Sequence, residues 1–195
     1  MLLQYSADTS AARWISESLV PFDQLVTFGP DGFAAYARLR YIPDPTRQGQ
    51  AESDQELPED HPSDLEQARR ALRVLAHHTD SPRHCFFCIW EGEGGISLPP
   101  GLEQHRLVDL LHRRYALFEG PLNAVETWED DFGQGSPTAP PALVWPADWR
   151  WCFASDVDPH WAGIGAGSAA IAALKQESGL DVVRADPHRP QPLYY

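Results

Sequence analysis

The sequence has few of the residues on which several large classes of protein depend. Of its 195 residues only three are cysteine, and the sole lysine is Lys175. An odd, small number of cysteines does not make the disulfide framework of a small secreted domain. A single lysine leaves little scope for Schiff-base chemistry or for the phosphate-binding lysine of a P-loop. None of these classes is therefore expected.

Long apolar runs are also lacking. The longest runs, such as Ala169–Leu174, are far shorter than the roughly 20 residues that cross a bilayer. The first residues do not show the basic segment and apolar stretch of a signal peptide. We therefore expect a soluble, cytoplasmic protein that has no membrane partner.

Positive charge is scarce as well. The formal net charge is −13, from 28 acidic and 15 basic side chains. Because nucleic acids are bound through clustered lysine and arginine, this balance predicts no nucleic-acid partner. The same charge makes a basic protein the electrostatically favoured partner.

Common catalytic signatures are absent from the sequence. It has no G-x-S-x-G, no H-E-x-x-H and no G-x-x-x-x-G-K-[ST] pattern. Catalytic residues also assemble from distant segments, so the question of catalysis stays open. The sequence favours a non-enzymatic protein, and no cofactor is expected.

The clearest predicted element is a helix over residues 63–78. Ser63 and Glu66 form an S-x-x-E capping box, which marks the start of a helix. Apolar residues, including Leu72 and Leu75, then recur at helical spacing. We expect this apolar stripe to pack against a β-sheet.

The remaining elements alternate irregularly. Shorter helices are expected over residues 11–19, 102–112 and 168–177, and strands over residues 25–28, 33–42, 84–90, 115–118 and 149–156. Strands grouped around helices without regular β-α-β alternation predict an α+β fold. We expect a single domain over residues 1–195, with an antiparallel sheet of about five or six strands and two to four helices packed on it.

Two polar connections interrupt these elements. Residues 43–62 form an acidic, proline-rich segment that has almost no large apolar side chain. In isolation such a composition is typical of a disordered linker, so its order depends on contacts with the rest of the protein. Residues 129–141 form a second polar connection, rich in glycine and proline.

Three segments together carry a family resemblance. They are HTDSPRHCFFCIWEG (residues 78–92), RYALFEGPL (114–122) and WPADWRWCFASDVD (145–158). With shorter matches near the N-terminus, they resemble a family of uncharacterised bacterial proteins over most of the chain. The resemblance implies a shared fold and no known activity.

The spacing Cys85-x-x-Cys88 is typical of zinc and redox sites, but here it falls in a predicted strand. Residues i and i+3 of a strand point to opposite faces, so the two sulfurs cannot easily share one metal ion. Cys152 stands alone, and no second C-x-x-C supplies further ligands. We interpret these cysteines as small buried hydrophobic residues and predict no metal.

Asp156, Asp158 and His160 recur with a period of two, which places their side chains on one side of an extended segment. Carboxylate oxygens suit hard cations, but two carboxylates and one imidazole are too few for a closed metal site. Asp-Pro is also ordinary turn chemistry. The three residues are candidates for binding rather than for holding a metal.

Gly163, Gly165, Gly167 and Ser168 are predicted to form a glycine-rich turn that enters a helix. Such a turn can present backbone N–H groups to an anion. It partly resembles the pyrophosphate loop of GCN5-type acetyltransferases, although His160 stands where that pattern has Gln or Arg. The alternative is a plain strand-to-helix connection with Ser168 as the N-cap.

Tryptophan is abundant, with seven residues in the chain. Trp145 and Trp149 flank Pro146 at a predicted turn, where a large amphipathic ring often meets a partner. The alternative is that these rings pack in the core.

These observations favour a non-enzymatic, acidic protein-interaction module, inhibitor-like or immunity-like, which covers a basic surface of a partner. The alternative is a small-molecule enzyme or binding protein that holds an anionic group at the Gly163–Ser168 turn, acyltransferase-like at most. In either case we expect the ligand or partner to engage one surface, formed by Trp145–Trp149 and Asp156–Ser168.

Overall fold

The computed structural model describes the whole chain except residues 1, 95, 97, 99–100, 102–105 and 134–137. Its strands are β1 (Gln4–Tyr5), β2 (Ala35–Arg40), β3 (Cys85–Trp90), β4 (Val108–Leu110), β5 (Arg113–Gly120), β6 (Leu143–Pro146), β7 (Trp151–Ala154), β8 (Trp161–Ala166) and β9 (Val182–Ala185). Its α-helices are α1 (Arg13–Ser16), α2 (Phe22–Phe28), α3 (Asp64–Ala76) and α4 (Ser168–Gln176). Shorter helical turns are η1 (Thr9–Ala12), η2 (Glu52–Asp54), η4 (Leu122–Thr127) and η5 (Glu129–Gly133).

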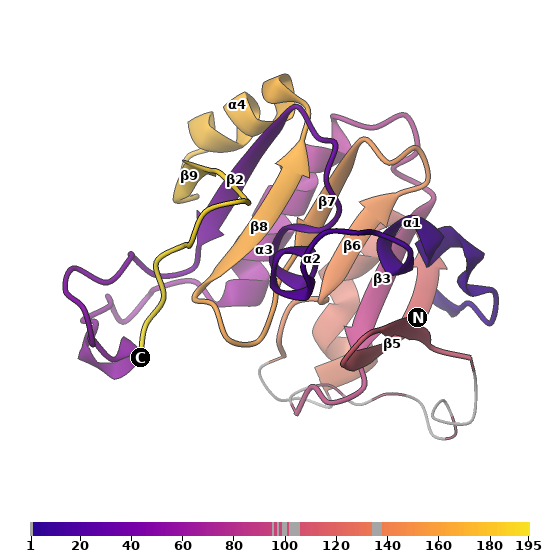
Figure 1. The fold of residues 1–195 in the computed structure, drawn as a ribbon, viewed down its shortest axis with the longest axis horizontal. Coiled ribbons are helices and arrows are strands. Elements are labelled where there is room, and N and C mark those ends of the chain that lie inside the picture. Colours follow the sequence, from indigo (N-terminus) through magenta and orange to yellow (C-terminus); the bar gives the residue numbers. More distant parts are fainter. Residues whose placement is uncertain (1, 95, 97, 99–100, 102–105, 134–137) are drawn as a thin grey trace.

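The strands form one open antiparallel sheet (Figure 1). Their order across the sheet is β1-β5-β3-β6-β7-β8-β2-β9, and β4 pairs with β5. The predicted α+β class and antiparallel sheet are confirmed. The sheet has nine strands in the described part of the chain, more than the five or six expected, because several strands are too short to show a periodic pattern in the sequence.

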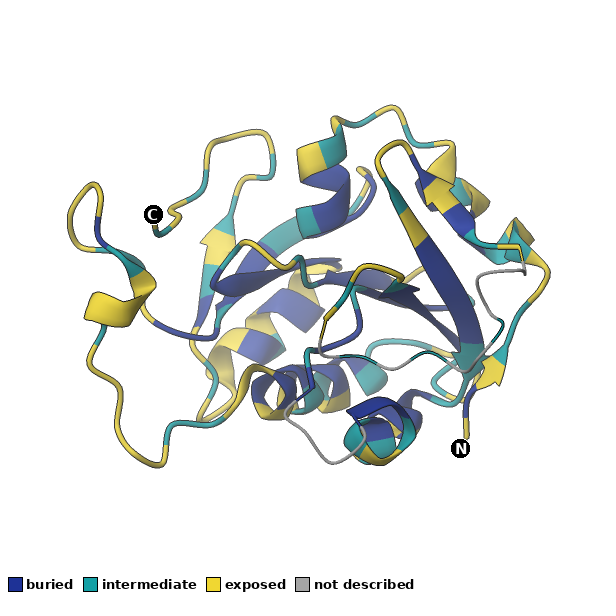
Figure 2. Cartoon of the chain, turned by 90° about the horizontal axis from the view of Figure 1, so that it is seen from below, coloured by how far each residue is buried: buried dark blue, intermediate teal, exposed yellow. Residues whose placement is uncertain are grey.

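Helices cover both faces of the sheet. In Figure 1, α1 and α2 lie in front of the strands and α3 lies behind them. In β3, Cys85 and Phe87 belong to the core on the α3 side, whereas Phe86 and Cys88 belong to the core on the α1 side. The prediction that Cys85 and Cys88 face opposite ways is confirmed. Because both faces are covered, the central strands are buried throughout (Figure 2).

The helix predicted at residues 63–78 is α3. Its capping box is present, since the Ser63 hydroxyl accepts a hydrogen bond from the Glu66 backbone N–H and the Glu66 carboxylate accepts one from the Ser63 backbone N–H. Leu72 and Leu75 are fully buried in the core that the α3 face of the sheet provides. The apolar stripe therefore packs as the sequence predicts.

The predicted glycine-rich turn is wrong in its first part, because Gly163 and Gly165 lie inside strand β8. Both glycines face α2 and the segment that follows it. A Cβ atom on Gly163 would lie 2.0 Å from the carbonyl oxygen of Thr27, and one on Gly165 would lie 2.4 Å from the ring of Phe33. The glycines therefore allow close packing on the sheet and do not form a flexible loop.

Two further predictions are wrong. The strand expected at residues 25–28 is the second half of α2, whose apolar side chains meet the sheet at helical spacing and which Gly29 ends with a φ of 78°. The helix expected over residues 102–112 falls partly outside the described residues, and residues 108–110 form β4, where pairing with β5 prevails over helix propensity. The helix expected at residues 11–19 is confined to η1 and α1.

The acidic segment 43–62 is tied to the sheet near both ends. Near its start, Asp44 bonds to side chains of β2, and near its end the ring of His61 lies 2.7 Å from the carbonyl oxygen of Tyr41. The C-terminal segment crosses it, and the Tyr194 hydroxyl donates to the Pro43 carbonyl. The second polar connection, 129–141, begins with the helical turn η5.

Within the described residues, no helix combines the length and the apolar character that a membrane crossing requires.

We predict that Gly163→Ala lowers the free energy of unfolding by about 1–3 kcal/mol, because the new methyl group overpacks the contact with α2. Gly94→Ala is the matched control, since nothing lies within 4 Å of its added Cβ and the residue is exposed outside the helices and strands. There the change should stay within about 0.5 kcal/mol. Chemical denaturation measures both values, and equal losses in the two variants would contradict the packing role of Gly163.

Candidate functional site

Antiparallel pairing brings the ends of several central strands together along one border of the sheet, which we call the strand-end edge. Arg40 at the end of β2 pairs with Trp161 at the start of β8, and Ala154 at the end of β7 pairs with Gly163. The residues that follow β2 and β7 and precede β8 therefore meet at this edge, which faces the viewer in Figure 2.

A cavity of about 220 Å³ opens at this edge. Its lining includes Tyr41, Trp90, Ser155 and His160. The charged side chains around it are five carboxylates and one guanidinium, namely Glu52, Asp64, Glu93, Asp156, Asp158 and Arg113. We call this cavity the acidic pocket.

The guanidinium of Arg113 already has partners. It forms an ion pair with Asp156, whose carboxylate is largely buried, and one nitrogen lies 3.9 Å from Asp158. Its central carbon lies 4.6 Å from the centre of the Trp90 ring, in cation–π contact. Arg113 is therefore not available to neutralise the remaining carboxylates.

Asp64, the first residue of α3, is the most perturbed acid of the pocket. Its side chain still reaches solvent, but the protein around it removes much of its hydration, and Glu52 adds a like charge. Together these effects raise the pKa of Asp64 to about 6. In the described residues, Asp64, Glu52 and Glu93 have no cationic side chain within salt-bridge distance.

The interior of the pocket is neutral and polar. The hydroxyls of Tyr41 and Ser155 lie 3.0 Å apart and bond to each other. Burial raises the pKa of Tyr41, so its hydroxyl stays protonated. These groups can donate to or accept from a ligand without adding charge.

Behind the pocket, Asp44 holds two side chains of β2 and one from the residue that directly precedes β8. Arg38 donates to both carboxylate oxygens, at 2.6 and 3.0 Å, and Arg40 donates at 3.0 Å. Nε2 of His160 lies 3.1 Å from the same carboxylate. Burial alone would raise the pKa of Asp44, but the bonds from Arg38 and His160 outweigh it and lower this pKa to about 2.

His160 takes part in this network as a neutral ring. Its side chain is 1% exposed, and burial lowers its pKa. Because a carboxylate only accepts hydrogen bonds, the proton lies on Nε2 and Nδ1 is left as an acceptor. In the part of the chain that the structure describes, Nδ1 is buried and has no partner.

The two aspartates and the histidine that the sequence marked as binding candidates do meet at the pocket. Asp156, Asp158 and His160 all line it. Their roles differ, since Asp156 is paired with Arg113, His160 is paired with Asp44, and Asp158 is 82% exposed at the rim.

The tryptophan and glycine candidates lie elsewhere. Trp145 is fully buried in the core. Trp149 is 56% exposed, but it precedes β7, at the opposite end of that strand from Asp156. The four candidates from the predicted glycine-rich turn are also away from the pocket or inside the sheet. Gly163 and Gly165 lie within β8, and Gly167 and Ser168 follow the end of β8 that is far from the pocket. The expected single surface is therefore wrong.

The anion-binding interpretation of the glycine segment loses its geometric basis. Gly163 and Gly165 are paired on both sides, with β2 and β7, so their backbone groups belong to the sheet. Gly167 is the N-cap of α4, and Ser168 is the first helical residue rather than the cap.

Sequence reasoning missed four residues that shape the site: Tyr41, Asp44, Asp64 and Arg113. Asp64 directly follows a capping serine, where an acid is fully explained by the helix dipole. Asp44 lies in a segment that resembles a linker in composition. A usable signal was the pair Arg38 and Arg40 on the polar face of a predicted strand, because buried cations require an anionic partner.

Comparisons with known proteins give no match, whether to a family model, to a curated protein or to a solved structure. The resemblance to an uncharacterised bacterial family therefore stays a prediction.

We predict that Asp44→Asn lowers the free energy of unfolding at pH 7 by about 3–5 kcal/mol, because it leaves the buried Arg38 guanidinium without its anion. The pKa of Asp44 is lowered from 3.8, so its contribution is present above pH 4 and is lost as the pH falls toward 2. The difference between wild type and variant should shrink over that range.

Asp54→Asn is the control for this measurement. Asp54 pairs with Arg47 on the surface, where both side chains are largely exposed. Its replacement should cost less than about 1 kcal/mol. Denaturant titrations at several pH values give both numbers, and similar losses at Asp44 and Asp54 would disprove the structural role of Asp44.

Proposed function

We propose that this protein is a non-enzymatic interaction module that binds a basic protein partner, and that one lysine or arginine side chain of the partner enters the acidic pocket. The observation that carries the proposal is the charge imbalance of the pocket. Five carboxylates surround it, and its single guanidinium is already paired. A cationic group is the natural complement of such a site.

The size of the pocket supports a side chain as the occupant. Sites for drug-sized molecules typically measure about 300–1,000 Å³, and the acidic pocket is smaller, at about 220 Å³. This volume suits one charged head group with part of its aliphatic stem. Tyr41 and Ser155, whose hydroxyls bond to each other, also line the pocket, and a hydroxyl oxygen can accept an N–H donor.

Acidic side chains outside the pocket favour a protein over a free amine. The loop that contributes Glu52 continues with further exposed acids, which are Asp54, Glu56, Glu59 and Asp60. A small amine would use only the pocket, whereas a basic protein surface would also meet the loop. Charge distributed in this way speeds encounter as well as adding affinity.

Catalysis at the pocket has less support. The only hydrogen bond of the Ser155 hydroxyl within the described chain is to Tyr41, not to a base that would activate it. His160, the nearest imidazole along the chain, is engaged with Asp44. The alternative function, an enzyme that holds an anion at residues 163–168, would need a loop where β8 stands.

The test uses the peptide Gly-Ser-Gly-Arg-Gly-Ser-Gly and a second peptide in which citrulline replaces arginine, which removes the charge and keeps the shape. We predict that the arginine peptide shifts the NMR signals of Tyr41, Asp64 and Ser155 and that the citrulline peptide does not. Asp64→Asn should lower the affinity for the arginine peptide by about tenfold, or about 1.4 kcal/mol of binding free energy. Glu17→Gln removes one charge at the end of α1 and should change the affinity by less than about twofold.

Two results would overturn the proposal. If both peptides shift the same signals equally, the pocket does not select positive charge. If free arginine binds as tightly as a longer basic peptide such as nona-arginine, the acidic loop adds nothing and the protein-partner part of the proposal fails.

A further inference from the structure

A second cavity lies beside the last turns of α3, at the other end of the helix from Asp64. It measures about 330 Å³ and opens between α3 and η4. Most of its lining is apolar, and Arg73, Arg83, Asn123 and Glu126 complete it; the apolar residues are Leu72, Ala76, Pro82, Pro121, Leu122 and Val125. The acidic pocket takes its Asp64 from the first residue of α3, whereas this cavity lies beside the last turns of the helix. We call it the apolar groove.

Polar bonds hold the two walls of the groove in place. Arg69 of α3 donates to the Val125 carbonyl of η4 at 2.8 Å. Arg73 forms a two-point ion pair with Glu126 at the rim, and this pairing keeps Glu126 charged by lowering its pKa. The rim charges of Arg73 and Glu126 therefore cancel each other.

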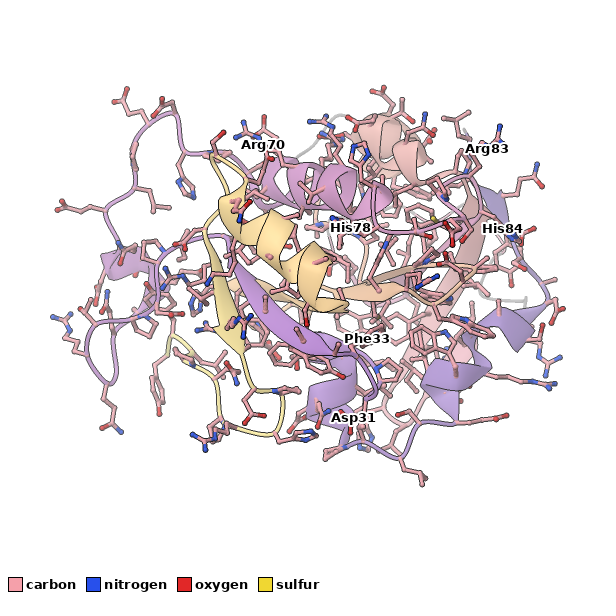
Figure 3. All side chains as sticks on the ribbon, turned by 90° about the horizontal axis from the view of Figure 1, so that it is seen from above. Asp31, Phe33, Arg70, His78, Arg83 and His84 are labelled. Carbon is pink, nitrogen blue, oxygen red and sulfur yellow. The ribbon has the colours of Figure 1, made fainter. Side chains whose placement is uncertain are left out.

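Arg83 differs from Arg73, the other arginine that lines the groove, which is paired with Glu126. It lines the groove and is exposed, and it has no ion pair or hydrogen bond within the described part of the chain. In Figure 3 it lies near η4, in the loop that leads into β3. In an acidic protein whose buried arginines are paired, this is a cation left free at the mouth of an apolar cavity.

We infer that the apolar groove is a binding site for a small aliphatic or aromatic monocarboxylate, whose hydrocarbon part fills the groove and whose carboxylate pairs with Arg83. Guanidinium groups match carboxylates in a two-point geometry. A dry apolar cavity of about 150 Å³ already accommodates benzene, so 330 Å³ accepts a chain of several methylenes. This inference is independent of the function proposed for the acidic pocket.

The experiment titrates octanoate, octan-1-ol and octylammonium into the ¹³C-methyl-labelled protein and follows the methyl signals of Ala76, Leu122 and Val125. Octanoate should shift these signals saturably, and octylammonium should bind at least about tenfold more weakly because Arg83 repels it. Octanol should lie between them, since it fills the groove but lacks the charge.

Three variants separate the charge from the cavity. Arg83→Gln should lower the affinity for octanoate by about five- to tenfold and leave the affinity for octanol unchanged. Arg70→Gln, which removes an exposed arginine of α3 that does not line the groove, should leave both affinities unchanged. Ala76→Phe should fill the groove and abolish binding of both while the thermal transition persists.

The inference is overturned if octanoate gives no saturable shift at the three methyl groups. It is equally overturned if octanol binds as tightly as octanoate, or if Arg83→Gln leaves the octanoate affinity unchanged. The Arg83 variant is expected to fold, because the replaced side chain is exposed and has no partner to lose.

Discussion

The Asp44 carboxylate makes the interaction on which the rest of this structure depends. It joins Arg38 and Arg40 of β2 to His160, which directly precedes β8, and it holds the start of the acidic segment 43–62. That segment carries Glu52 to the pocket. Because Asp44 consumes the nearby cations, the carboxylates at the pocket rim remain unpaired. The negative charge by which the pocket would favour a cation thus remains because the nearby arginines are paired with Asp44.

Full coverage of the sheet decides where binding can occur. The central strands are buried on both faces, so chemistry is confined to the strand ends and to the outer surfaces of the helices. The acidic pocket occupies the strand-end edge, and the apolar groove lies between α3 and η4. The two sites have opposite requirements, since one has unpaired anions and the other has one unpaired cation. Asp64 begins α3 and Arg83 lies in the loop that follows the helix, so these two charges are too far apart to neutralise each other.

The sequence predicts the parts of this architecture that local pattern controls. The capping box at Ser63 marks the start of α3 correctly, and strand alternation places Cys85 and Cys88 on opposite faces. It fails where a distant contact decides the outcome. In the sequence Gly163 looks like a turn residue, but the structure shows that the Thr27 carbonyl leaves no room for a side chain there. Asp64 looks like an acid that only interacts with the helix dipole, but the fold brings Glu52 close to it. Asp156 and His160 were recognised as binding candidates, but their partners Arg113 and Asp44 come from other strands and loops.

The most direct test of the account is the pKa of Asp64, measured from the pH dependence of its carboxyl ¹³C signal without and with a saturating arginine peptide. We predict a value near 6 in the free protein, raised by the surrounding protein and by Glu52, and a clear fall when a guanidinium enters the pocket. A free-protein value near 3.8 that the peptide leaves unmoved would contradict both the environment described for Asp64 and the function proposed for the pocket.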